Sequence, residues 1–221
     1  YEVRLNFEPL ERRDLLDARP LPLPVLFVGS GPGQAPLVRV YNAETGTLNY
    51  DLLAYESQFK GGVRVGAGDI TGDGYPDLIV SPGPGRAPEI RVLDGKTGVP
   101  VVGPLGDLLA FSKDFQKGVF AAAADVDGDG RTDVIAATET PSGPRIKVFS
   151  GATGQPLASF LVPGVPFAKG LTVAAADLTG DGKAEIVVGS SDSSRVRTYN
   201  PLVGTIIAGP LGIFDAFGPS Y

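Results

Sequence analysis

Three nine-residue segments of this sequence combine acids and glycines in the same order. They read DITGDGYPD (69–77), DVDGDGRTD (125–133) and DLTGDGKAE (177–185). Oxygen-bearing side chains stand at positions 1, 3 and 5, glycine at position 6, and an acid at position 9. Carboxylates this close together repel one another, so the pattern indicates either a solvated turn or a site where a cation makes the repulsion tolerable.

A hard cation such as Ca²⁺ takes about six to eight oxygen ligands, which a turn can supply when oxygen side chains recur at alternate positions and glycine allows the bend. Position 7 would add a backbone carbonyl, and the acid at position 9 would close the site. The candidate metal ligands are therefore Asp69, Thr71, Asp73, Tyr75 and Asp77; Asp125, Asp127, Asp129, Arg131 and Asp133; and Asp177, Thr179, Asp181, Lys183 and Glu185.

A metal-free turn is the alternative, because Asp and Gly favour tight turns without any ion. Three copies with the same oxygen spacing favour calcium, about three ions in all. The second segment has four carboxylates and should bind most tightly, whereas Thr71 and Thr179 are weaker ligands that act through a water or not at all. An EF-hand is excluded, because position 12 requires Glu and is here Val80, Ala136 and Val188.

The acidic segments belong to a longer internal repeat. The text starting at Phe59 returns at Phe115 and Phe167, at spacings of 56 and 52 residues, and Tyr221 holds the next equivalent place. A second shared block follows each acidic segment: EIRVLDGKTG (89–98), RIKVFSGATG (145–154) and RVRTYNPLVG (195–204), with LVRVYNAETG (37–46) ahead of them all. At repeat spacing the aromatic residues are expected in the core rather than at a ligand site.

Each unit reads as four short strands separated by turns, and no stretch shows helical periodicity. DLIV, DVIA and EIVV are continuously apolar and are expected to be buried strands. Four-stranded units at a fixed period bury their faces by stacking, which predicts an all-β fold of β-propeller blades. The units are about 25–58, 59–114, 115–166 and 167–221; the first is incomplete, so fifteen repeat strands are readable.

The missing strand leaves two alternatives for residues 1–24. YEVRLNF (1–7) alternates like a strand and could fill the gap in its own chain or in a neighbour. Alternatively, 1–24 is a leader ahead of RPLPLP and the chain continues past Tyr221.

Composition narrows the function. The sequence contains no His and no Cys, which excludes the Ser-His-Asp triad, thiol nucleophiles and thiolate metal sites, and we expect no enzyme activity. The formal net charge of −6 disfavours nucleic acids and anionic membranes as partners. No apolar run is long enough to span a bilayer.

Residues 59–94 and their two relatives resemble FG-GAP and VCBS repeats, the units of integrin-alpha-type β-propellers. The D-x-[TD]-G-D-G-x-x-[DE] loops are the specific part of the resemblance, which implies calcium at the ligands named above. Phe59-Lys60-Gly61 stands where FG would be and Ser81-Pro82-Gly83 where GAP would be, which favours a divergent bacterial secreted form. FEPLERRDLLDA (7–18) also resembles a region found after the export signal of some secreted bacterial proteins.

We therefore expect a non-enzymatic, calcium-stabilised extracellular protein. It would act in adhesion or as a self-assembling subunit of a surface fibre or coat, with a second copy, a cell surface or a matrix as partner. A carbohydrate-binding propeller is the alternative, although Trp, its expected mark, is absent. The propeller part of a larger secreted enzyme is a third possibility.

Overall fold

The computed structural model describes residues 25–138, 140, 144–163, 171–190 and 193–217. These residues form fifteen strands and no helix, as the sequence predicts. The strands are β1 (Val25–Gly29), β2 (Leu37–Asn42), β3 (Leu48–Leu53), β4 (Val63–Gly68), β5 (Asp77–Pro82), β6 (Glu89–Leu93), β7 (Asp107–Leu109), β8 (Val119–Ala124), β9 (Asp133–Thr138), β10 (Arg145–Phe149), β11 (Pro156–Leu161), β12 (Leu171–Ala176), β13 (Glu185–Ser190), β14 (Arg195–Tyr199) and β15 (Ile213–Asp215).

The strands form four antiparallel sheets in chain order. The second, third and fourth sheets have the orders β4-β5-β6-β7, β8-β9-β10-β11 and β12-β13-β14-β15, whereas the first holds only β1-β2-β3. By position in the repeat, the first sheet lacks the strand that corresponds to β4. Within the described residues, no strand pairs with the outer edge of β1.

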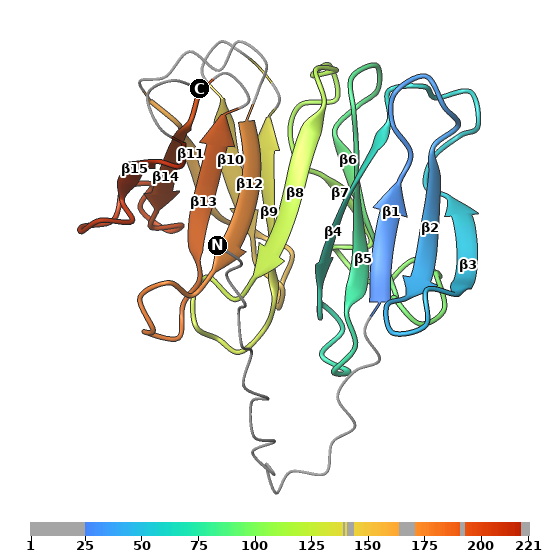
Figure 1. Cartoon of the computed structure of the whole chain (residues 1–221), viewed down its shortest axis with the longest axis horizontal. Coiled ribbons are helices and arrows are strands. Elements are labelled where there is room, and N and C mark those ends of the chain that lie inside the picture. The colour runs from blue at the N-terminus through green and yellow to red at the C-terminus, as the bar shows by residue number, and fades with distance from the viewer. Residues whose placement is uncertain (1–24, 139, 141–143, 164–170, 191–192, 218–221) are drawn as a thin grey trace, which may run out of the picture.

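The four sheets stand side by side in a row, as the blades of a propeller do (Figure 1). The first strands of the complete sheets, β4, β8 and β12, are neighbours in that row. The first and fourth sheets form its two ends (Figure 1).

The continuously apolar segments form the second strand of each complete sheet. All six residues of β5 are buried, and so are all six of β9. They have a strand on either side and a neighbouring sheet over each face, so no position of these strands faces water. This is why the usual alternation of apolar and polar residues is missing there.

Hydrophobic clusters fill the spaces between consecutive sheets. Val38, Tyr55 and Leu78 lie in the cluster between the first and second sheets, and Leu108 and Val134 in the next one. The third cluster joins the last two sheets. The core of this protein is therefore a series of interfaces between sheets.

The repeated aromatic residues fall partly within these clusters. Phe59 is buried in the first cluster and Phe115 packs against the second, as expected for core positions. Phe167 and Tyr221 lie outside the described residues, as does the whole of 1–24 with its candidate donated strand and leader motif.

The turns that follow β2, β6, β10 and β14 have the same hydrogen-bond pattern in all four sheets. In each turn, the first polar side chain accepts hydrogen bonds from the backbone N–H groups two and three residues on, at distances of 2.9 to 3.3 Å; these residues are Asn42, Asp94, Ser150 and Asn200. The closing glycine has a φ of about 70° in each copy, a conformation that disfavours other residues. No helix in the described ranges is long and apolar enough to cross a bilayer.

Candidate calcium-binding loops

The three acidic segments connect the first two strands of the complete sheets. They join β4 to β5, β8 to β9 and β12 to β13. Because β4, β8 and β12 lie side by side in the same direction, the loops emerge at one end of the row, the lower edge in Figure 1. From Val25 onward, where the described residues begin, the first sheet has neither the first strand nor the loop.

The acid at position 1 organises the backbone of each loop. In the second loop, Asp125 Oδ1 accepts from the Gly128 N–H at 2.7 Å and Oδ2 from the Gly130 N–H at 2.8 Å. Asp69 and Asp177 do the same in the other loops. The chain is therefore wrapped around one carboxylate in each loop.

Glycines allow this wrapping at two positions. The predicted glycine at position 6 has a φ of 80 to 85° in the three copies, and the glycine at position 4 has a φ of 74 to 82°. The requirement at position 4 was not recognised from the sequence, although Gly72, Gly128 and Gly180 recur there.

The acids at position 9 differ from the others because they are buried. Asp77, Asp133 and Glu185 are each less than 5% exposed. Asp133 Oδ2 accepts from the Val126 N–H at 3.0 Å, and its Oδ1 accepts from the Gly151 N–H at 2.7 Å. Asp77 likewise bonds its own loop and the Gly95 N–H of the next turn. Asp77 and Asp133 therefore tie their loops to the neighbouring hairpin, a role that sequence reasoning missed, whereas Glu185 accepts from Leu178 N–H and the Thr179 hydroxyl of its own loop.

Burial raises the pKa of the Asp77 carboxyl, although backbone N–H groups partly oppose it. Burial also raises the pKa of Asp133, with further upward contributions from the charges of Asp127 and Asp129. A desolvated carboxylate beside other carboxylates is a favourable ligand for a cation, because the cation offsets both the desolvation and the repulsion. The all-oxygen donor set fits Ca²⁺ or Mg²⁺ rather than a softer metal.

The second loop brings its carboxylates closest together. Oxygens of Asp125, Asp127 and Asp133 all lie within 4.8 Å of one another, and this is the one group of three acids in the described ranges that meets this spacing. These three acids could hold a metal ion together, and tightest binding at the second loop stays a prediction.

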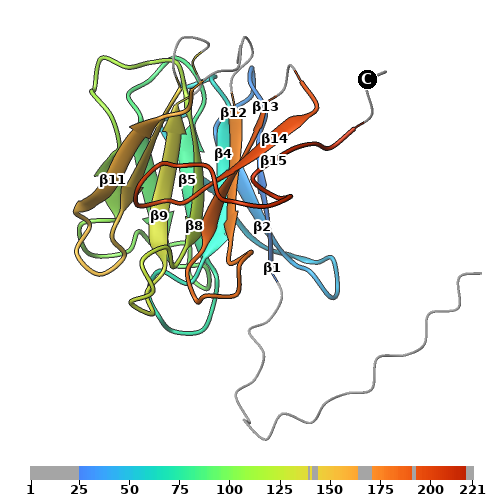
Figure 2. The same cartoon turned by 90° about the vertical axis from the view of Figure 1, so that its left-hand side faces the viewer.

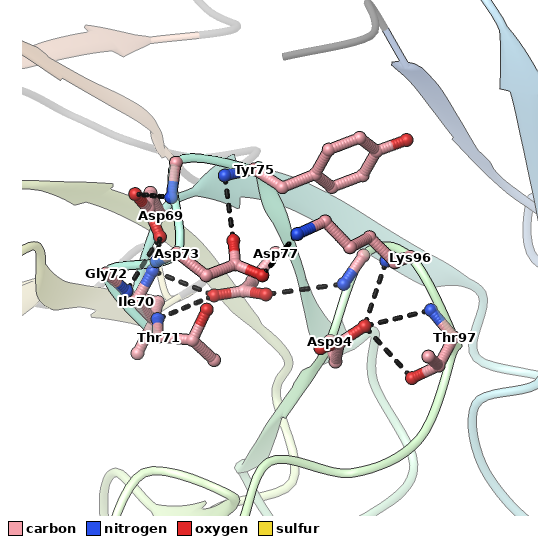
Figure 3. A network of polar contacts seen from close by, with 12 residues as sticks. Asp69, Ile70, Thr71, Gly72, Asp73, Tyr75, Asp77, Asp94, Lys96 and Thr97 are labelled. Carbon is pink, nitrogen blue, oxygen red and sulfur yellow. Dashed lines mark hydrogen bonds and ion pairs between the residues drawn. The ribbon is translucent and has the colours of Figure 1, made fainter. Parts of the chain in front are cut away.

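The first loop already has a cation of its own. Lys96, in the turn after β6, places its Nζ 2.6 Å from Asp73 Oδ2 (Figure 3). This hydrogen bond lowers the pKa of the exposed Asp73 carboxyl. Lys96 was not among the candidates, and sequence reasoning had no means to find it because 23 residues separate it from Asp73.

The remaining candidates divide by position. At position 3, the Thr179 hydroxyl donates to Glu185 Oε1 at 3.2 Å, so it is directed toward another candidate ligand. Tyr75, Arg131 and Lys183, proposed to act through their carbonyls, donate their N–H groups to the acids at position 5 at 2.8 to 2.9 Å. At position 12, Val80, Ala136 and Val188 are buried apolar residues within strands, β5 and β9 being buried throughout and β13 only in part, which confirms that the loops are not EF-hands.

Family models match two parts of the chain. The model described as FG-GAP repeat covers residues 61–88, and the one described as FG-GAP-like repeat covers 125–188. The chain contains FG-GAP repeats. The first matched range includes the acidic loop at 69–77, and the second includes the loops at 125–133 and 177–185. The acidic loops are thus part of the FG-GAP repeat unit.

Solved structures share the fold at low sequence identity. The rhamnogalacturonan lyase PL11 of Bacillus licheniformis is 16% identical with a TM-score of 0.51, over 82% of this chain and 39% of the lyase. The exotype rhamnogalacturonan lyase YesX is 18% identical with a TM-score of 0.47, over 80% of this chain and 35% of the lyase. This chain therefore spans about two fifths of the length of the lyases it matches. At this identity the first of these structures supports the propeller-like fold alone. No curated protein matches the sequence significantly.

Proposed function

We propose that this protein is a non-enzymatic, calcium-stabilised structural module that works outside the cell, in adhesion or as a self-assembling subunit of a fibre or coat. The observation that carries the proposal is the acidic loop, present three times at one end of the row of sheets. Each loop is formed from backbone N–H groups directed at a carboxylate, with further oxygens at fixed spacing.

The size of the calcium effect fits a structural role. Extracellular calcium modules have dissociation constants of about 10⁻⁴ to 10⁻³ M, so about 1 mM calcium adds roughly 0.4 to 1.4 kcal/mol per site. Three sites give on the order of 1 to 4 kcal/mol, a substantial part of the free energy of unfolding of an ordinary domain. Cytosolic calcium is too scarce to fill such sites, which favours an extracellular location.

Self-association is supported by the incomplete first sheet. The outer edge of β1 offers backbone N–H and C=O groups that no described strand pairs. Open edges of this kind promote pairing with another chain, so strand complementation between subunits is one means of assembly.

The absence of catalysis is supported by the use of the acids. The acids at positions 1 and 9 already accept backbone hydrogen bonds, and the sequence has no histidine to act as a general base. The likeness to lyases leaves a different role as the alternative, a propeller part of a larger secreted enzyme. A carbohydrate-binding role has less support, because no tryptophan is present to stack on a sugar ring.

Thermal unfolding with 1 mM calcium and with a chelator tests the proposal. We expect calcium to raise the melting temperature by about 2 to 12 °C, from the free energies above and the usual size dependence. Magnesium at the same concentration is the control, and we expect a smaller shift because Mg²⁺ requires a tighter octahedral site. An unchanged melting curve on chelation would show that the loops are metal-free turns.

A further inference from the structure

The two end sheets expose surfaces that the inner sheets bury. Each sheet has an outgoing face, which is directed toward the next sheet in chain order, and an incoming face, which is directed toward the preceding sheet. The outgoing face of the fourth sheet and the incoming face of the first have no described sheet over them. Figure 2 views the row from the side of the fourth sheet.

The outgoing faces of the second and fourth sheets have equivalent residues. Val92 N–H donates to Gly106 O at 3.1 Å, and Thr198 N–H donates to Gly212 O at 3.0 Å in the same place. Leu105 and Leu108 in the second sheet therefore correspond to Leu211 and Phe214 in the fourth. The first two are 4% and 8% exposed, in a cluster with residues of the third sheet, whereas Leu211 and Phe214 are 44% and 36% exposed.

The incoming face of the first sheet shows the same contrast. Val28 pairs with Arg39 across β1 and β2 as Val80 pairs with Arg91 across β5 and β6, so Val28 and Val80 are equivalent. Val80 is fully buried in the cluster between the first two sheets. Val28 is 44% exposed.

The incoming face of the first sheet has a hollow at the position where, on the second sheet, the side chain of Tyr55 is bound. Tyr55, at the end of the first sheet, is buried against the second, with its hydroxyl 3.2 Å from Val80 O and 2.8 Å from Glu89 O. The Arg91 guanidinium lies 5.1 Å from the centre of its ring. The positions equivalent to Val80, Glu89 and Arg91 in the first sheet are Val28, Leu37 and Arg39, and they line a hollow of about 300 Å³.

The side chain that would fill this hollow, Phe217, belongs to the fourth sheet at the other end of the row. Ala110 and Ala216 donate their N–H groups to the chain before the third strand of their sheets, so the residues that follow them, Phe111 and Phe217, are equivalent. Phe111 lies under the third sheet, with Lys147 Nζ 5.3 Å from its ring centre. Phe217 is 56% exposed.

In the second, third and fourth sheets, a cationic side chain contacts the preceding sheet. Arg91 also donates to Ala54 O at 2.9 Å, Lys147 lies over Phe111, and Arg197 donates to Pro163 O. Arg39 has the same place in the first sheet and is exposed. A cation attracts the face of an aromatic ring, so the Arg39 hollow favours an aromatic side chain.

We propose that a second copy of this chain docks head to tail, with the outgoing face of its fourth sheet on the incoming face of the first sheet. Leu211 and Phe214 of one copy then pack on Leu26 and Val28 of the other, and Phe217 enters the hollow beside Arg39. The contact continues the internal sheet-to-sheet interface, because the described residues of this chain partly expose both of its halves, Leu211 and Phe214 on one face and Leu26 and Val28 on the other. Because the two faces differ, repeated docking builds a ring or a filament rather than a two-fold dimer.

This inference rests on the proposed structural role and specifies its partner and surfaces. The experiment uses two variants of the whole chain, each carrying a carboxylate on one face. Val28→Asp blocks the incoming face and Leu211→Asp the outgoing face; both sites are exposed in the single chain, so each variant is expected to fold. Arg39→Glu is a second incoming-face variant, and Leu109→Asp is the matched control because the fourth sheet carries Asp215 in that place.

Sedimentation velocity in calcium is the measurement. We expect the unmodified chain and Leu109→Asp to form larger species as concentration rises. Each blocked variant alone should associate about tenfold or more weakly, because a buried carboxylate has no partner in the interface. An equal mixture of Val28→Asp and Leu211→Asp should form a dimer and stop there, since one intact face remains on each copy.

Three results would overturn the inference. In the first, either blocked variant assembles as the unmodified chain does. In the second, the mixture of the two variants stays monomeric. In the third, the unmodified chain is monomeric at every concentration, as it would be if further repeats of the same chain filled these faces. The calcium-dependent melting of the same samples is a separate readout. If calcium raises the melting temperature but the chain does not associate, the proposal of a calcium-stabilised module still holds. If the chain associates without a calcium-dependent shift, only the calcium part of the proposal is wrong.

Discussion

The acids of each loop divide into two groups with different surroundings. Asp133 is buried, and both its oxygens accept backbone N–H groups from two different turns. Asp127 is half-buried, and one oxygen accepts from the Asp129 N–H at 3.1 Å. We therefore expect Asp133 to hold the fold together with or without an ion, and Asp127 to matter mainly if an ion binds.

Two alanine variants separate these roles. Asp133→Ala should lower the free energy of unfolding by about 2 to 4 kcal/mol even in chelator, because it leaves buried N–H groups without acceptors. Asp127→Ala should change it by less than about 1 kcal/mol in chelator but remove the calcium stabilisation of the second loop. Urea unfolding with and without calcium measures both, and equal losses in chelator would contradict the division.

The first loop shows how a side chain distant in sequence can change a site. Lys96 neutralises Asp73 through a contact that forms only when the turn after β6 lies beside the loop, as in Figure 3. A calcium ion that uses this Asp73 oxygen must compete with the ammonium group. This competition is a second reason, besides the carboxylate count, to expect weaker binding at the first loop than at the second.

At the scale of the elements, each loop depends on glycines that hold its backbone in the left-handed region. Gly130 has a φ of 82° and no atom near the place a Cβ would occupy, so a side chain there meets strain but no clash. The sharp turn between β8 and β9 therefore depends on backbone freedom at this residue.

Alanine at Gly130 measures that dependence. Gly130→Ala should lower the free energy of unfolding by about 1 to 2 kcal/mol, the usual cost of a left-handed conformation for an L-residue. Gly31→Ala is the matched control, because Gly31 has equally open surroundings and is not in the positive-φ region. It should be neutral or stabilising by up to about 1 kcal/mol, and an equal loss at the two sites would refute the role of φ.

At the scale of the whole molecule, stability comes from sheet-to-sheet interfaces, so the same residue type has different importance along the row. Leu105 and Leu211 occupy the same place in the repeat, and within the part of the chain that the structure describes only Leu105 has a following sheet over it. Exposure differs between them by a factor of about ten, although the local sequences, PLG, are identical.

The two leucines therefore provide a matched pair of truncations. Leu105→Ala should destabilise the chain by about 2 to 5 kcal/mol, as for other buried leucines. Leu211→Ala should cost less than about 1 kcal/mol in dilute solution, where copies do not associate. Denaturant unfolding at low protein concentration provides the comparison, and similar losses would mean that the fourth sheet is already covered.

The local structure of this protein and its repetition follow from the amino-acid sequence alone. Alternating and continuous apolar runs predicted the strands, and recurring glycines and acids located the turns and loops, because these features depend on residues close together in the chain. The repeat predicted the four sheets, and apolar residues at Val80, Ala136 and Val188 excluded an EF-hand.

The contacts of the repeated residues depend on the tertiary structure. The bonds from Asp77 and Asp133 to the next hairpin, the ion pair of Lys96, and the cations that reach back to the preceding sheet all join segments far apart in sequence. The burial of Leu105 and the exposure of Leu211 likewise follow from where a sheet stands in the row. Identical local sequences cannot encode that difference, because burial depends on the neighbour that packs against the residue.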